Sequence, residues 1–108
     1  MKNRLKRNSD FDKVFKKGKR GFSKSLLLIY IPSDSLKIGL SVSKKHGKAV
    51  TRNKIKRLLR AAIGKIEDRL GKYHIVILPK VAVSYDYSAF LSDLEKIAVK
   101  ENLINDNK

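Results

Sequence analysis

The chain has 108 residues, 42% hydrophobic and 33% charged, and no cysteine, which predicts one globular domain without disulfides or thiolate metal sites. The N-terminus lacks the apolar core of a signal peptide, and the longest apolar run, residues 26–31, is too short to span a bilayer, so we expect a cytoplasmic protein. The net charge of +16 is concentrated in residues 1–66, where 20 Lys/Arg face three Asp/Glu, while residues 67–108 hold six against seven. So uneven a field favours a polyanionic partner, with nucleic acid first and an anionic membrane surface second.

The N-terminal quarter of the chain predicts a basic arm followed by a short helix. Residues 1–8 are basic and polar, and we expect them to form a flexible arm. The stretch SDFDKVFKKG that follows predicts a helix with Ser9 as its N-cap, Asp12 at the capping-box position and Gly18 as its end. Phe11 and Phe15 lie one helical turn apart on its apolar face.

Two strands are predicted next. The continuous apolar run of residues 25–31 is typical of a strand buried on both faces, and the alternation in residues 37–43 predicts a second strand. One face of the second strand is almost bare, because it carries only Gly39, Ser41 and Ser43. Either something packs very close to that face or it is an open floor.

The second half of the chain predicts helix, strand and helix. A long helix is expected from about Thr51 to about Leu70, with Gly71 as its C-cap, then a strand at residues 73–79 and an amphipathic helix at residues 88–102. The predicted order is therefore helix, strand, strand, helix, strand, helix. This order indicates a single α+β domain over residues 1–108, with three helices and a mixed sheet of three to four strands.

The long helix carries an unusual charge pattern. Its first part, KAVTRNKIKRLLR (Lys48–Arg60), contains six cations and no carboxylate. Opposite the apolar stripe, Asn53, Lys56, Arg57 and Arg60 fall within an arc of about 100°. Neighbouring like charges destabilise an isolated helix by about 0.2–0.5 kcal/mol per pair, so helix stability gives no reason to choose them. A phosphate backbone bound along this face would explain the charges. Because carboxylates are missing, a face that is merely solvated is the weaker interpretation.

No arrangement of residues in the sequence indicates an enzyme active site. The basic region lacks the clustered carboxylates that a metal-dependent nuclease needs, and the two histidines, His46 and His74, are isolated. No Gly-rich phosphate loop and no metal-ligand spacing appears. We therefore predict a polypeptide that binds nucleic acid and is not itself catalytic, and leave open whether it binds metal ions.

At residues 39–60, GLSVSKKHGKAVTRNKIKRLLR, the sequence resembles the signature segment of the protein subunit of bacterial ribonuclease P. The stretch FDKVFKKG at residues 11–18 resembles the Phe-containing first helix of that family. The resemblance implies a partner of a large catalytic RNA that removes the 5′ leader from precursor tRNA, with the RNA doing the chemistry through Mg²⁺ held mainly by the RNA and the substrate. The protein would bind the leader and broaden the substrate range. We expect it neither to bind a membrane nor to need another protein as an obligate partner. The resemblance also implies a left-handed strand–helix–strand crossover around the long helix.

The resemblance further implies two groups of site residues. The Arg-Asn-Arg motif of the family corresponds to Arg52, Asn53 and Lys54, where the lysine keeps the charge but loses the guanidinium fork. The surface expected to contact the catalytic RNA comprises Arg52, Asn53, Lys54, Lys56, Arg57 and Arg60. The expected leader cleft comprises Phe11, Phe15, Lys44, Lys45 and either Ile29 or Tyr30, which point to opposite faces of their strand. Core packing is the alternative role for the two phenylalanines.

Two other hypotheses use the same basic surface. A ribosomal or other structural RNA-binding protein would be equally small and basic, and the segment at residues 39–60 argues against it. A stand-alone nuclease would need the missing carboxylate cluster.

Overall fold

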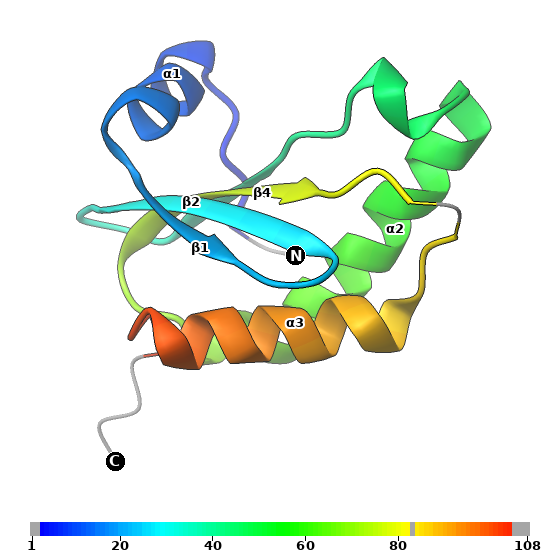
Figure 1. Cartoon of the computed structure of the whole chain (residues 1–108). Coiled ribbons are helices and arrows are strands. Elements are labelled where there is room, and N and C mark those ends of the chain that lie inside the picture. The colour runs from blue at the N-terminus through cyan, green and yellow to red at the C-terminus, as the bar shows by residue number, and fades with distance from the viewer. Residues whose placement is uncertain (1–2, 83, 105–108) are drawn as a thin grey trace.

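The computed structural model describes residues 3–82 and 84–104, which form three α-helices on a four-stranded sheet (Figure 1). The elements are α1 (Asn8–Lys17), β1 (Lys19–Phe22), β2 (Leu26–Pro32), β3 (Lys37–Leu40), the 3₁₀ turn η1 (Lys44–His46), α2 (Ala49–Ile66), the 3₁₀ turn η2 (Glu67–Arg69), β4 (Tyr73–Pro79) and α3 (Tyr87–Lys100). The predicted α+β class and the predicted order of elements are confirmed, with one strand added.

The sheet is mixed, with strand order β1-β2-β4-β3. The pairs β1–β2 and β2–β4 are antiparallel, whereas β3 and β4 are parallel neighbours joined through α2. The added strand is β1, whose sequence KRGF buries only Gly21 and so has no apolar alternation to predict it. It forms because the chain turns at residues 23–25, so that β2 runs back antiparallel to β1 and pairs with it.

The two faces of the sheet are covered differently. Val14 of α1 packs with Leu5, Ile29, Ile31 and Val76 in a small cluster on one face, which we call the α1-side cluster. On the other face α2 and α3 cover the main core, whose sheet residues include Leu28, Tyr30, Ile38, Ile75 and Ile77. Figure 1 shows α1 above the sheet and α3 running below it. The apolar run of β2 is therefore buried on both faces, as predicted.

The start of α1 differs from the prediction. The helix begins at Asn8 with Arg7 as its N-cap and without a capping side chain, so the prediction of Ser9 as the N-cap was wrong. The reason lies upstream: Leu5 donates its N–H to the Ile38 carbonyl (2.9 Å) and so fixes where the chain leaves the sheet. The predicted end of the helix at Gly18 is confirmed.

The start of the chain, predicted to be a flexible arm, makes backbone contacts with the sheet from Asn3 onward. Residues 1 and 2 lie outside the described residues, but Arg4 bridges Ile38 in the manner of a parallel strand, and Leu5 is buried. We call residues 3–7 the N-terminal strap. The sequence did not indicate these contacts, because one leucine among polar residues shows no periodicity.

Two boundaries around the long helix also move. The strand predicted at residues 37–43 ends at Leu40, because Ser43 instead caps η1 by accepting from the Lys45 N–H (3.3 Å). Helix α2 starts two residues earlier than predicted and tightens into η2. Leu70 is already extended, so Gly71 is not the C-cap, and that prediction was wrong.

Candidate nucleic-acid interface

The apolar stripe of α2 is buried and its basic face points outward. Ile55, Leu59, Ala62, Ile63 and Ile66 are buried against the core. On the other side Asn53, Arg57 and Arg60 are exposed and Lys56 is half-buried. The helix contains no carboxylate of its own, so these side chains present a row of charge without compensation from their own helix. Such a row is suited to an anionic polymer.

The motif residues Arg52, Asn53 and Lys54 do not share one face of α2, because successive residues turn by about 100° around a helix. Asn53 lies with the basic face, whereas Lys54 lines a different hollow together with His46 and Tyr85. Arg52 is half-buried, and its buried Nε has no hydrogen-bond partner among the residues that the structure describes. The structure thus brings together Asn53, Lys56, Arg57 and Arg60 and separates Lys54 from them.

A groove runs beside β3, one of the two outer strands of the sheet, and connects α2 with the N-terminal strap. Its apolar lining comes from Leu5, Phe11, Ile38, Gly39 and Leu40, and its cations are Arg4, Lys56 and Arg60. Sequence reasoning missed Arg4 and Leu5, because their segment was expected to be flexible. We call this hollow the β3 groove.

Gly39 explains how close the first helix comes to the sheet. A Cβ atom built on Gly39 would lie 2.4 Å from Cζ of Phe11, so the Phe11 ring occupies the space that any other side chain would need. Of the two interpretations of the bare strand face, close packing therefore applies at this position. Phe11 is half-buried and packs against the α1-side cluster, while Phe15, one turn later, is 37% exposed.

The sheet places Ile29 and Tyr30 on opposite faces, as their alternation predicted. Ile29 is on the α1 face, but at 2% exposure it lies under α1 rather than in an open cleft. Tyr30 is on the opposite face, where its hydroxyl donates to Glu101 Oε1 (2.6 Å). Burial, together with this hydrogen bond, raises the pKa of Tyr30 to about 12. Both side chains are therefore buried, on opposite faces of the sheet.

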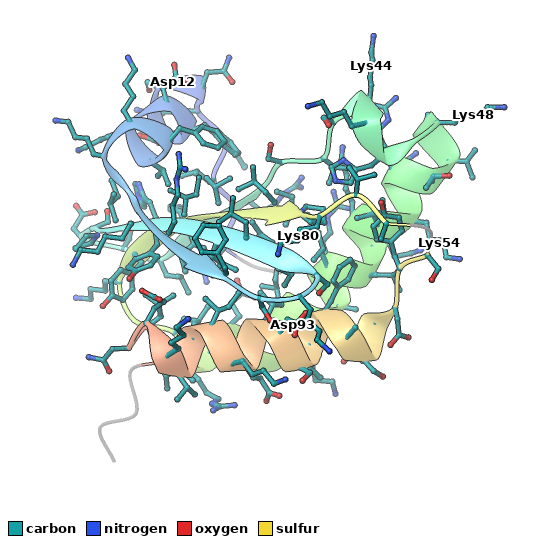
Figure 2. The ribbon with its side chains drawn as sticks, in the orientation of Figure 1. Asp12, Lys44, Lys48, Lys54, Lys80 and Asp93 are labelled. Atoms are coloured by element: carbon teal, nitrogen blue, oxygen red, sulfur yellow. The ribbon has the colours of Figure 1, made fainter. Side chains whose placement is uncertain are left out.

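Lys44 and Lys45 extend the positive surface at the end of β3. Both are exposed on η1, which Ser43 and His46 hold by reciprocal capping contacts. The His46 Nε2 atom lies 2.6 Å from the Pro79 carbonyl oxygen, which ties η1 to the end of β4. In Figure 2, Lys44 rises on the same side of the sheet as α1, whereas Asp93 lies on the far side with α3.

Asp93, one of the buried carboxylates among the described residues, lies away from this basic surface. Asp93 is buried on α3, where Ser25 donates to it through its backbone N–H (2.9 Å) and its hydroxyl. Burial alone would raise the pKa of Asp93, but the hydrogen bonds from Ser25 and Ser23 outweigh it and lower the pKa. Within residues 3–82 and 84–104, no three His, Asp or Glu side chains come together as a metal site would require.

No helix in the described ranges is long and apolar enough to cross a membrane.

Comparisons with known proteins agree with one another. The family model described as ribonuclease P matches residues 1–101. The chain is 38% identical over 106 residues to the ribonuclease P protein component of Shouchella clausii, covering 94% of this chain and 87% of that protein. It is 41% identical over 92 residues to the Listeria welshimeri protein of the same name, covering 80% and 76%.

Solved structures give the same result at lower identity. The RNase P protein of Staphylococcus aureus superposes with a TM-score of 0.84 at 28% identity, covering 97% of this chain and all of that chain. The RNase P protein of Thermotoga maritima superposes with a TM-score of 0.76 at 26% identity, covering 88% and 94%.

Proposed function

The chain belongs to the family of ribonuclease P protein components, and on that basis we propose that its β3 groove binds the single-stranded 5′ leader of precursor tRNA. As a member of this family it is a subunit of a tRNA-processing endonuclease and associates with ribonuclease P RNA. We propose which surface of the protein contacts each RNA. We also propose that the polypeptide is not catalytic and that the RNA carries the active site.

One observation supports the β3 groove as the binding site of the leader. The β3 groove places an apolar lining, with Phe11 against Gly39, beside the cations Arg4, Lys56 and Arg60. A single strand needs such a combination, because its bases stack on apolar or aromatic surfaces while its phosphates lie along cations. Stacking on an aromatic side chain contributes about 1–3 kcal/mol per base and tolerates any sequence, as a general processing enzyme requires. Phe15 and Lys44 extend the proposed path over the α1 face.

The exposed basic face of α2 is the proposed contact with the catalytic RNA. Arg57 and Arg60 can each fork onto a phosphate, and Asn53 can add directional hydrogen bonds. Because Lys56 and Arg60 also line the β3 groove, leader and catalytic RNA would meet along the same helix. Lys54 would contact RNA from a different face of α2, beside His46 and Tyr85.

Magnesium enters the proposal through the RNA. The described residues bring no cluster of carboxylate and imidazole groups together, so we assign Mg²⁺ mainly to the RNA subunit and the substrate. The protein would contribute by neutralising phosphates and orienting the leader. Absence of an obligate protein partner, and the cytoplasmic location, stay predictions.

Affinity for substrates with and without a leader tests the proposal. The complex of this protein with a bacterial ribonuclease P RNA should bind precursor tRNA more tightly than mature tRNA, and Lys56→Ala should reduce that difference. Lys100→Ala removes the same charge from exposed α3 and is the matched control. If Lys56→Ala and Lys100→Ala behave alike, the groove is not the leader site.

A further inference from the structure

Glu67 lies where neither the helix nor a bound RNA favours a negative charge. It follows α2 directly and is only 3% exposed. A carboxylate near a helix C-terminus opposes the helix dipole, and burying it costs free energy unless it is hydrogen-bonded. It is also seven residues beyond Arg60, about 10 Å along the helix, where a negative charge would repel a phosphate backbone bound to the basic face. Its position therefore calls for a structural reason.

Contacts between Glu67 and the start of the N-terminal strap supply that reason. The Oε2 atom accepts hydrogen bonds from the Asn3 backbone N–H (2.8 Å) and from Asn3 Nδ2 (3.0 Å). Hydrogen bonds to an ionised acceptor are about twice as strong as neutral ones. The first described residue of the strap is thus tied to the end of α2, 64 positions away in the sequence.

From Asn3 the strap continues along β3. Ile38 donates its N–H to the Asn3 carbonyl (2.7 Å), and Leu5 donates to the Ile38 carbonyl (2.9 Å). Leu5 is 6% exposed and belongs to the α1-side cluster. The strap therefore covers the edge of β3.

The strap also shapes the β3 groove. Arg4 and Leu5 line it, and the Leu5 Cβ and the Phe11 ring are the neighbours that close over Gly39. The strap then ends at Arg7, whose carbonyl accepts from the N–H groups of Asp10 and Phe11 in the first turn of α1. The position of the strap consequently fixes both a cation and an aromatic ring of the groove.

We propose that Glu67 is a positioning residue for RNA binding: by holding Asn3 it keeps the strap on β3, and so keeps Arg4 and Phe11 along the groove. The proposal rests on the leader binding proposed above and adds a residue that touches no RNA. It predicts the opposite sign from electrostatics alone. Removing a negative charge from an RNA-binding protein should tighten binding, whereas releasing the strap should weaken it.

The test uses the full chain reconstituted with a bacterial ribonuclease P RNA. Glu67→Met removes the hydrogen bonds while filling similar space, and Glu67→Gln keeps an amide oxygen that can accept from Asn3. Glu95→Gln removes the same charge from the partly exposed pair with Arg69 and serves as the control. The readouts are amide hydrogen exchange of the free protein at Leu5 and Ile38, and the affinity for precursor tRNA relative to mature tRNA.

In Glu67→Met we expect faster amide exchange at Leu5 and Ile38 and unchanged exchange in the β2–β4 ladder. Leader-dependent binding should be about tenfold weaker, because the strap is less often bound along β3. Glu67→Gln should restore most of both, and Glu95→Gln should bind as tightly as wild type or more tightly. Asn3→Ala, which leaves α2 intact, should show a smaller change in the same direction.

Three outcomes are distinguishable. Unchanged exchange at Leu5 and Ile38 in Glu67→Met would show that Glu67 does not hold the strap. Faster exchange with equal or tighter leader binding would show that the strap does not position the groove. If the wild-type complex has no leader-dependent affinity, the proposed function fails instead, and the exchange data still decide whether Glu67 holds the strap.

Discussion

Replacing Gly39 by alanine tests whether Phe11 is held against β3 as the groove requires. The new Cβ would lie 2.4 Å from Phe11 Cζ, and ordinary contact begins at 3.4 Å, so the ring edge must retreat by about 1 Å. The Leu5 Cβ, at 3.3 Å, limits movement on its side. Overpacking of this kind costs about 1–3 kcal/mol, and each kcal/mol lowers Tm by about 4–8 °C in a domain of this size.

The assay for Gly39→Ala combines thermal unfolding with the affinity difference between precursor and mature tRNA. Both should fall, because the displaced ring no longer presents the same surface to the leader. Gly64→Ala is the matched control, since it makes the same change at an exposed position of α2, with nothing within 4 Å of the new Cβ. It should raise stability by about 0.4–1 kcal/mol by restricting the unfolded chain, and leave the affinity difference between precursor and mature tRNA unchanged. A Gly39→Ala protein as stable and as leader-selective as wild type would refute the close packing of Phe11.

Three further predictions concern other parts of the chain. Arg57→Ala or Arg60→Ala should weaken RNA binding broadly and reduce the slope of log affinity against log salt by about 0.7–0.9 for each lost phosphate contact; an unchanged slope would remove that residue from the interface. Phe15→Ala should cost little stability because the ring is partly exposed, yet reduce binding of precursor tRNA more than of mature tRNA; equal losses would leave it only a packing role. Because the pKa of Tyr30 is raised from 10.0 to about 12, neutral Tyr30 contributes stability that is complete below pH 10 and lost as pH rises to about 12. The unfolding free energy of Tyr30→Phe should therefore fall less steeply across that pH range than that of wild type, and parallel curves would contradict the assigned role of Glu101.

Elements with a strong periodic pattern could be predicted from the sequence. The stripe from Ile55 to Ile66 gave the buried side of α2, and with it the outward direction of Arg57 and Arg60. The apolar runs gave β2 and β4 almost to the residue. In each case the local pattern determines which residues are buried, regardless of what packs on them.

Features that depend on distant partners could not be predicted. The N-terminal strap is ordered by Ile38 and Glu67, far along the chain, and nothing around Leu5 indicates this. The alternation in β2 placed Ile29 and Tyr30 on opposite faces, but only the position of α1 decides which face each occupies. The bare face at Gly39 indicated a close approach without naming Phe11 as the neighbour.

Cleavage of a precursor tRNA at low Mg²⁺ tests the central claim most directly. The reaction is run with this protein alone, with a bacterial ribonuclease P RNA alone, and with both together. We expect efficient cleavage at the mature 5′ end only in the mixture, because the protein supplies leader binding and phosphate neutralisation while the RNA supplies the active site. Cleavage by rigorously RNA-free protein, or a mixture no faster than the RNA alone, would contradict it.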